Sequence, residues 1–539
     1  MAETLEHTGF EELTIARFHQ LLRSGQVTSA ELTAWYLQRI ADLDQGGPRI
    51  NALVTVNTAA LAEAEELDAH FARTGQLVGP LHGVPVVVKD QAETAGIPTA
   101  FGCSLFADYV PERDATVITR LRAAGAVLLG KTAMCDFAAG WFSFSSRTGF
   151  TRNPYDLQRE TGGSSAGTAA ALAANLALVG VGEDTGGSIR LPASFTNLFG
   201  LRPTTGLVSR TGFSPLVHFQ DTPGPMARTV TDAAVVLDVI AGWDAQDEYT
   251  ALAAGHEHLG SFAADLQARE STAPQLSSWR VGVLEDAFGQ GPEHEHTNAV
   301  VRVAIERMRA EGVTVVDGLQ LGNVQEWISG TSLYTTQSKQ DLADFLAARP
   351  TAPAKSWEQI AAAGAFHPLT DLVVDIVAGP EDPMDEPDYL PRRLRQEQLR
   401  RRLSALMAAA DVDVLIYPTV QVPAPTREEL AAKRWTALTF PTNTVLASQS
   451  SLPAASVPVG FTPAGLPVGL EVLAPVMGEQ RLLRFARAWE RTAGARRAPQ
   501  LAAADGEPTT ASSTGSVTHS TAAAVTVPAP AAGLEAAAL

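Results

Sequence analysis

The sequence predicts an α/β fold, in which one sheet is covered by helices on both faces. Short apolar runs that are typical of buried strands alternate with helical segments: residues 84–88 precede a helix at 115–124. The alternation continues with a helix at 164–175 and a strand at 176–181. Apolar residues make up 45% of the 539-residue chain and charged residues 18%, which is the composition of a globular protein with a large core.

The first 75 residues are predicted to form an N-terminal helical segment. Thr28 and Glu31 have the spacing of a capping box, in which each residue caps a backbone N–H group at the start of a helix. Residues 57–73 are rich in alanine and glutamate, which favour helix.

The second half of the chain has weaker signals but ends in a clear change of composition. Its predicted strands are 281–284, 313–316, 413–417, 454–461 and 468–474, and its predicted helices are 297–311 and 480–492. From residue 498 onward Lys, Arg and aromatic residues are absent. Such a segment buries too little apolar surface to offset the entropy of ordering it. We therefore expect a core over residues 76–495 and a disordered tail over 496–539.

Charge and cysteine content limit the setting in which the protein works. A formal net charge of −19 argues against nucleic acid or an anionic membrane as a partner. The chain has no apolar run of about 18 residues and no apolar signal region at its start, so we expect a cytoplasmic protein. Its two cysteines, Cys103 and Cys135, lack the spacing of a metal site. Low cysteine usage favours a reducing compartment, although a disulfide between the two stays open.

Three other patterns are interpreted as structural. Residues 125–132 match a phosphate-binding loop, but their Val and Leu residues indicate a strand, so Lys131 is expected to be structural. His294 and His296 lack a third metal ligand and fit a solvated helix start. The arginines of residues 392–402 alternate with leucines and indicate an amphipathic helix.

Residues 182–190 are the most informative segment of the sequence. Gly186 and Gly187 precede Ser188 there, and consecutive backbone N–H groups beside a hydroxyl can form an oxyanion hole. A serine needs an activating group, and the upstream sequence offers Ser164 and Lys89. Burial behind an apolar strand would lower the lysine pKa toward neutrality. The alternatives are a helix-capping serine, a plain glycine turn and a surface lysine.

Several segments in order resemble the amidase signature family of serine hydrolases. They span roughly residues 13–489, and the motifs lie at 82–90, 162–205, 224–230, 452–454 and 465–470. The resemblance implies a single-domain amidase signature fold with a large mixed central sheet. It implies hydrolysis of the C–N bond of a small or aryl carboxylic amide, with no metal and no cofactor.

The resemblance also implies a role for each residue of the serine–serine–lysine set. Ser188 is the expected nucleophile, Ser164 the bridging serine after a cis peptide bond from Gly163, and Lys89 the base. The backbone N–H groups expected to form the oxyanion hole belong to Thr185, Gly186, Gly187 and Ser188. A neutral lysine would accept a proton from the bridging serine, and the bridging serine would accept one from the nucleophile.

The substrate is less constrained than the reaction. Trp141, Phe142 and Phe144 are expected to border the acyl pocket, although ordinary core packing explains them equally well. Glu183 stands where threonine is frequent in the family. Its charge would disfavour anionic substrates or raise the pKa of Lys89.

Three functions are compatible with these residues. The first is a free-standing amidase with a small-molecule amide substrate. The second is the amidase (glutaminase) subunit of a tRNA-dependent amidotransferase, although the tyrosine-rich segment of that family member is not evident. The third is an inactive binding or scaffold homologue, which is expected to lose Lys89 or Ser188, and both are present. A homodimer stays open.

Overall fold

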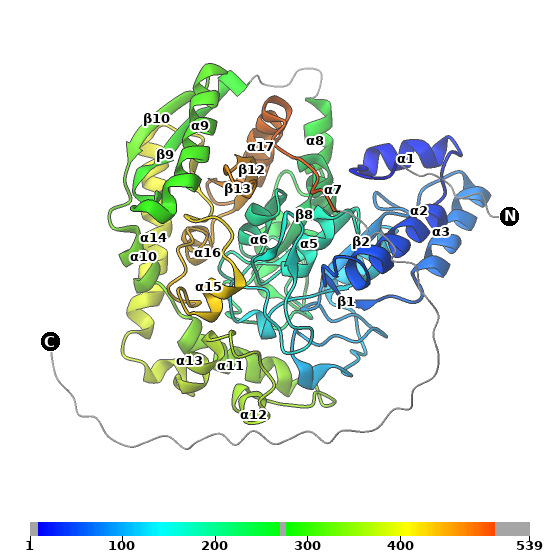
Figure 1. Ribbon diagram of the computed structural model, residues 1–539, viewed down its shortest axis with the longest axis horizontal. Helices are drawn as coiled ribbons and strands as arrows, with labels where there is room; N and C mark the ends of the chain where they lie inside the picture. The colour runs from blue at the N-terminus through cyan, green and yellow to red at the C-terminus, as the bar shows by residue number, and fades with distance from the viewer. Residues whose placement is uncertain (1–8, 270–275, 502–539) are drawn as a thin grey trace, which may run out of the picture. The chain divides into compact units, whose positions relative to one another are not determined.

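The computed structural model describes residues 9–269 and 276–501. The strands of its central sheet are β1 (Leu53–Val56), β2 (Pro85–Lys89), β3 (Val127–Thr132), β6 (Val179–Glu183), β7 (Phe199–Arg202), β8 (Pro223–Ala227), β9 (Arg280–Leu284), β10 (Thr314–Leu319), β11 (Val414–Pro418), β12 (Ala454–Phe461) and β13 (Pro467–Leu473). They lie in the order β1-β3-β2-β6-β8-β7-β12-β13-β11-β9-β10. Figure 1 shows β9 and β10 on one side of the molecule and β1 and β2 on the other. Two short strands, β4 (Arg152–Asn153) and β5 (Asp156–Glu160), pair separately.

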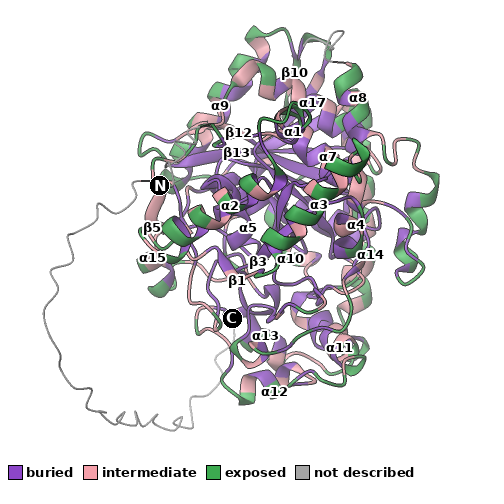
Figure 2. Ribbon diagram, turned by 90° about the vertical axis from the view of Figure 1, so that its right-hand side faces the viewer, coloured by how far each residue is buried: buried purple, intermediate pink, exposed green. Residues whose placement is uncertain are grey.

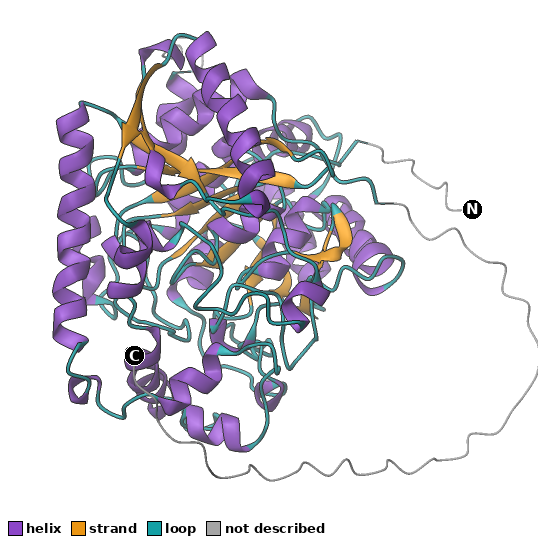
Figure 3. Ribbon diagram, turned by 60° about the vertical axis from the view of Figure 1, so that its left-hand side comes forward, coloured by secondary structure: helices purple, strands orange, loops and turns teal. Residues whose placement is uncertain are grey.

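The α-helices surround this sheet. In chain order they are α1 (Ile15–Arg23), α2 (Ser29–Arg39), α3 (Ala60–Thr74), α4 (Thr116–Ala123), α5 (Ala166–Ala173), α6 (Arg190–Phe195), α7 (Val230–Ile240), α8 (Phe262–Ala268), α9 (Glu295–Ala310), α10 (Val324–Gly330), α11 (Tyr334–Ala347), α12 (Trp357–Ala362), α13 (Leu372–Ala378), α14 (Tyr389–Ala410), α15 (Arg427–Ala431), α16 (Val445–Ser450) and α17 (Glu479–Ala493). Figure 3 shows the strands in the interior and the helices on the outside.

The chain path explains why helices cover both faces of the sheet. Strand β2 pairs in parallel with β3 on one side and with β6 on the other. The connection through α4 runs from β2 to β3, and the connection through α5 runs back past β2 to β6. Because such crossovers are right-handed, α4 and α5 lie on opposite faces. The mixed α/β sheet predicted from the sequence is therefore confirmed.

The segments that carry the candidate residues lie in a fully buried part of the sheet. Every residue of β2, β6 and α5 is buried, and Figure 2 shows strands in the buried colour inside a shell of partly exposed helices. Since α5 is buried all round, its alanines allow close packing against β2 and β6. The loops that leave the ends of β2 and β6 are consequently shielded from solvent.

The N-terminal segment contains one strand that the sequence reading missed. The capping box of Thr28 and Glu31 is present at the start of α2, as predicted. Strand β1 follows it and pairs antiparallel with β3 at the edge of the central sheet. Its Leu-Val-Thr-Val sequence is rich in the β-branched residues that favour strands, so the signal was there.

Several smaller expectations can be compared directly with the structure. Residues of the rejected phosphate-loop pattern form β3, and Cys103 and Cys135 are buried free thiols. In α14 Leu399 and Leu403 are buried as an amphipathic helix requires, whereas Leu394 is 64% exposed and does not share that face. Within the described residues, no helix combines the length and the apolar content that crossing a membrane requires.

The described residues, 9–269 and 276–501, belong to one compact unit. The boundaries predicted at residues 75 and 495 stay predictions. Most of the predicted tail, residues 502–539, lies outside the described residues.

Candidate active site

Lys89 ends strand β2 and is completely buried. Its Nζ atom lies 2.7 Å from Ser164 Oγ and 3.1 Å from the main-chain oxygen of Glu183. Parallel pairing of β2 with β3 and β6 aims the strand end at the loops that follow those two strands. The structure thus brings together Lys89 and Ser164, which the sequence separates by 75 residues.

The surroundings of Lys89 favour its neutral form. Burial lowers the pKa of Lys89 below the ordinary lysine value, while the neighbouring Glu183 carboxylate partly offsets that effect. A buried ammonium loses its hydration, so release of one proton becomes easier than in water. A lower lysine pKa makes the neutral amine, the form that can accept a proton, easier to reach.

The two serines before α5 make contacts that exclude the simple capping alternative. The peptide bond from Gly163 to Ser164 is cis. Ser165 occupies the N-cap position of α5 but makes no side-chain capping bond; its hydroxyl donates to the main-chain oxygen of Glu183 at 3.2 Å. Its backbone N–H donates to the main-chain oxygen of Ser188 at 3.1 Å. The loop before α5 and the loop before α6 are therefore tied together.

Close packing requires glycine at two positions before Ser188. A Cβ atom on Gly186 would lie 2.5 Å from the Tyr334 hydroxyl oxygen, and one on Gly187 would lie 2.0 Å from Thr444 Oγ1. Gly187 also has a φ of +135°, which side chains disfavour. Glycine is therefore needed at both positions for the loop to pack against Tyr334 and Thr444. The absence of side chains also leaves the backbone N–H groups open to a ligand.

The carbonyl groups of this loop are all held by donors outside it. The acceptors and donors are Thr185 O with Gln220 Nε2 at 2.6 Å, Gly186 O with Thr444 Oγ1 at 2.7 Å, and Gly187 O with Leu191 N at 2.8 Å. Within residues 9–269 and 276–501, no hydrogen bond occupies the backbone N–H groups of Thr185, Gly186, Gly187 and Ser188. A loop with fixed carbonyls and unengaged N–H groups is suited to binding an oxyanion.

A buried charge network fixes both ends of the same loop. Asp184 accepts hydrogen bonds from Arg190 at 3.1 Å and from Arg202 at 3.2 Å, and Arg190 also pairs with Glu471. Burial opposes ionisation of Asp184, but the two arginine charges prevail and hold its pKa well below the usual range. Asp184 and Arg190 flank Gly186 and Gly187, so the network limits movement of the loop.

Glu183, the last residue of β6, contacts Lys89 directly. Its Oε2 atom lies 3.3 Å from Lys89 Nζ, and both side chains are completely buried. Burial raises the pKa of Glu183 to about 7 against the opposing effect of the lysine charge. The sequence placed Glu183 near the site, and the structure places it against the expected base.

A narrow cavity adjoins Ser188. It is lined by Ala138, Gly140, Trp141, Gly186, Ser188, Leu216, Tyr334 and Leu372. Trp141 and Tyr334 meet edge to face, with ring centroids 5.9 Å apart. The sequence reading missed Leu216, Tyr334 and Leu372, because they come from segments far from Ser188 that carry no motif.

Only Trp141 of the three predicted pocket aromatics lines this cavity. Phe142 packs edge to face on Phe440 at 5.1 Å, and Phe144 stacks on His367 at 5.0 Å. Both are buried in the neighbouring apolar cluster. Their contacts match the core-packing alternative that the sequence left open.

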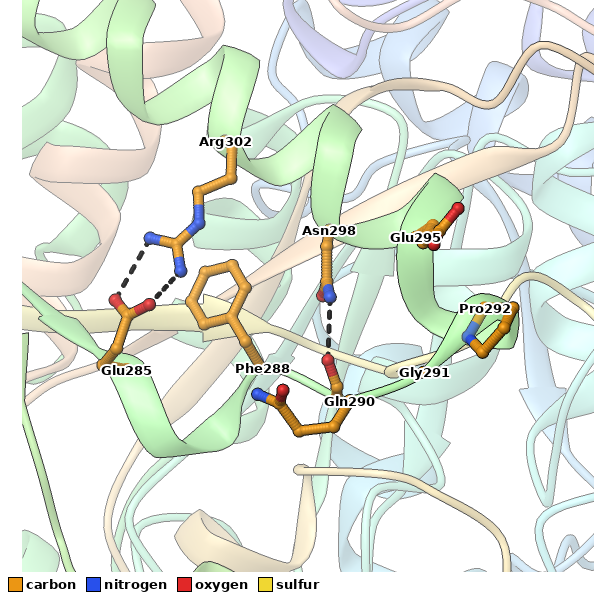
Figure 4. Close-up of a pocket in the computed structure, with 9 residues that line it drawn as sticks. Glu285, Phe288, Gln290, Gly291, Pro292, Glu295, Asn298 and Arg302 are labelled. Atoms are coloured by element: carbon orange, nitrogen blue, oxygen red, sulfur yellow. Dashed lines mark hydrogen bonds and ion pairs between the residues drawn. The ribbon is translucent and has the colours of Figure 1, made fainter.

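A more open hollow lies at the start of α9, away from these residues. Figure 4 shows Arg302 turned toward Glu285, and its guanidinium also lies 3.8 Å from the ring centre of Phe288. His294 is buried there, with Nδ1 3.1 Å from the main-chain oxygen of Gln421. No cluster of three metal-ligating side chains occurs among the described residues. Within the lining of this hollow, Arg302 and Glu285 neutralise each other.

Comparison with known proteins gives a consistent family. A model of the amidase family matches residues 31–483. The crystal structure of peptide amidase from Stenotrophomonas maltophilia superposes with a TM-score of 0.81 at 34% identity, and the match covers 92% of this chain and 99% of that one.

Two further relatives are subunits of a glutamyl-tRNA(Gln) amidotransferase. The one from Myxococcus xanthus is 35% identical over 487 residues, which are 89% of this chain and 97% of the relative. The crystal structure of the one from Thermotoga maritima has a TM-score of 0.70 at 25% identity, with 92% of this chain and 99% of that chain covered. The relatives therefore differ in the reaction that their names give, and similarity to them does not identify the substrate of this chain.

Proposed function

The chain belongs to the amidase family and is a hydrolase of amide C–N bonds, and from that premise we propose that it is a free-standing amidase for small neutral carboxamides with apolar or aryl acyl groups. The reaction releases a carboxylate and ammonia or an amine. Ser188 is the nucleophile, Ser164 the proton bridge and Lys89 the base.

The proposed mechanism follows one proton path. Neutral Lys89 accepts the hydroxyl proton of Ser164, which accepts the proton of Ser188 as Ser188 Oγ attacks the carbonyl carbon. The backbone N–H groups from Thr185 to Ser188 stabilise the oxyanion that forms. The same path in reverse delivers a proton to the leaving nitrogen, and water then hydrolyses the acyl-enzyme.

The contact of Lys89 with Ser164 carries this proposal. A distance of 2.7 Å is short enough for direct proton transfer, and complete burial of Lys89 removes competition from water. The tie from Ser165 to Ser188 supports the second step, because it holds the bridging serine and the nucleophile on adjacent loops.

The cavity beside Ser188 supports a neutral acyl group. Among the described residues that line it, none carries a charge, and Leu216 and Leu372 supply apolar walls. Free glutamine carries both an ammonium and a carboxylate, which an uncharged wall leaves unpaired at considerable cost. This observation favours an amidase for uncharged amides over a glutaminase.

The purified chain alone tests the function. We expect it to release ammonia from uncharged aliphatic or aryl amides at a kcat/KM at least tenfold higher than from glutamine. Ser188→Ala should abolish turnover of every substrate. Preference for glutamine would contradict the proposed substrate class, and activity that survives Ser188→Ala would contradict the mechanism.

Two neighbouring aromatic residues test the pocket. Trp141→Ala should change the ratio of kcat/KM between a short and a bulky amide by about tenfold, since one apolar wall of the cavity is lost. Phe142→Ala is the matched control, because Phe142 packs on Phe440 instead. An unchanged ratio in Trp141→Ala, or equal changes in both variants, would contradict the pocket assignment.

A further inference from the structure

Glu183 gives this active site a carboxylate in direct contact with the expected base. Its Oε2 atom lies 3.3 Å from Lys89 Nζ with both side chains fully buried. Its other oxygen, Oε1, accepts the Thr222 backbone N–H at 3.3 Å. This donor holds the carboxyl group on the side away from the lysine, so that Oε2 faces Nζ.

The other charged or titratable groups near Lys89 and Glu183 are either neutral or paired with other residues. Burial keeps the pKa of the Cys135 thiol well above its ordinary value, so the thiol stays neutral beside Lys89. Asp184 is ion-paired with Arg190 and Arg202.

On the far side of Glu183 lies a second carboxyl group, that of Asp221. It accepts the Thr185 hydroxyl at 2.6 Å and the Leu216 backbone N–H at 3.0 Å. Burial raises the pKa of Asp221. Of the groups that face Lys89, Glu183 is thus the one whose charge acts on the lysine at contact distance.

We propose that Glu183 is a positioning residue that pairs with Lys89, strengthens it as a base and moves the onset of activity to higher pH. The inference rests on the proposed function, since it assumes that Lys89 must be neutral before Ser188 reacts.

The physical reason lies in the proton that Lys89 gains during the reaction. When the O–H bond of Ser164 breaks, a new N–H bond forms with the lone pair of Nζ, and Lys89 becomes positively charged. A carboxylate at 3.3 Å stabilises that charge. The same attraction favours the ammonium form of the free enzyme, so a smaller fraction of Lys89 is neutral at low pH. Glu183 thus makes Lys89 a stronger base but lowers the activity of the enzyme at low pH.

Glu183→Gln tests the inference, because it keeps the size of the side chain and removes its charge. We expect the acid limb of kcat/KM, measured between pH 5 and 10 on an uncharged amide, to move down by about one pH unit. At high pH the variant should be about three- to tenfold slower than the wild type, because its lysine is a weaker base. The two profiles should therefore cross.

Asp232→Asn is the matched control. Asp232 is also a buried carboxyl group, with a pKa that burial raises to about 6, but it accepts the backbone N–H of Ile15 and lies on α7. This variant should move neither the acid limb nor the limiting rate. Glu183→Thr provides a second, smaller replacement should the glutamine variant fold poorly.

A fluorophosphonate probe distinguishes failure of the Glu183 proposal from failure of the proposed function. The probe reacts with an activated serine and needs no amide substrate. The acid limb of its reaction rate with Ser188 should shift in Glu183→Gln by the same amount as the acid limb of kcat/KM. A variant that reacts with the probe on an unshifted or upward-shifted limb overturns the inference and leaves the proposed function intact. A wild type that neither hydrolyses amides nor reacts with the probe contradicts the proposed function and, with it, the inference.

Discussion

Two buried lysines at the ends of neighbouring strands have different surroundings. Lys89 ends β2, and Lys131 lies in the adjacent β3, where its register partner is Val88. Each is almost inaccessible to solvent and lies near a carboxylate, Glu183 for Lys89 and Asp90 for Lys131. Burial lowers the pKa of both lysines. Burial and a carboxylate neighbour are therefore insufficient to mark a catalytic base.

The hydrogen-bond partners distinguish the two. Lys131 Nζ donates to the main-chain oxygen of Ala92 at 2.5 Å and to Thr99 Oγ1 at 3.0 Å, which join β3 to a loop. Lys89 instead reaches Ser164, whose neighbour Ser165 is tied to Ser188. The partners of Lys131 play no part in the proposed mechanism, whereas Lys89 contacts the proposed proton bridge. The comparison supports a structural role for Lys131 and the proposed chemical role for Lys89.

The largest effect is expected for Lys89→Met. Removal of a general base typically costs about 10²- to 10⁴-fold, so kcat should fall by at least about 100-fold at every pH from 6 to 9. The fold should survive, because the uncompensated Glu183 carboxyl can hold a proton near neutral pH. Steady-state kinetics and a thermal melt check both statements. Turnover within threefold of the wild type would remove the distinction between the two lysines.

Lys131→Met should lower the stability of the protein strongly and its activity only slightly, the reverse of Lys89→Met. Loss of the lysine leaves Asp90 buried without its counter-ion, which costs about 3–5 kcal/mol of the free energy of unfolding. Urea unfolding measures that loss, and kcat per folded molecule should fall far less than in Lys89→Met.

The double variant Lys131→Met with Asp90→Asn is the control for that experiment. It should recover part of the lost stability, since an amide tolerates burial better than an unpaired carboxylate. If Lys131→Met instead lost turnover without losing stability, its structural role would be wrong.

A smaller effect concerns Glu160, a buried carboxyl group that is held by Ser143 rather than by a lysine. Burial raises the pKa of Glu160 to about 7 from an ordinary value of 4.5. Its stabilising contribution is therefore complete below about pH 4.5 and is lost as the pH rises through 7. Relative to Glu160→Gln, the wild type should lose a few degrees of Tm between pH 5 and 8. A wild type that gains Tm over that range relative to the variant would contradict the sign.

Local sequence patterns were sufficient to predict individual strands and helix starts. The apolar run before Lys89 marked a buried strand, and Thr28 with Glu31 marked the start of α2. The order of separate motifs predicted the fold class and the residues that meet at the site.

Contacts between distant segments were beyond a reading of local patterns. Tyr334 reaches the Gly186 loop from α11, and its own sequence neighbourhood resembles any amphipathic helix. Glu183 and Lys89 lie 94 residues apart, and only the parallel pairing of β2 with β6 brings them into contact. Phe142 and Phe144 illustrate the same limit, because their proximity in sequence to Trp141 does not give them the same contacts.

Direct observation of the Lys89 ionisation tests the central claim. The chain has only five lysines, Lys89, Lys131, Lys339, Lys355 and Lys433, so ¹³Cε-labelled lysine gives five NMR signals that single variants assign. The Lys89 signal should report loss of its proton at least about one pH unit below the ordinary lysine value of about 10.4. A Lys89 signal that titrates at or above that value would contradict Lys89 as the neutral base.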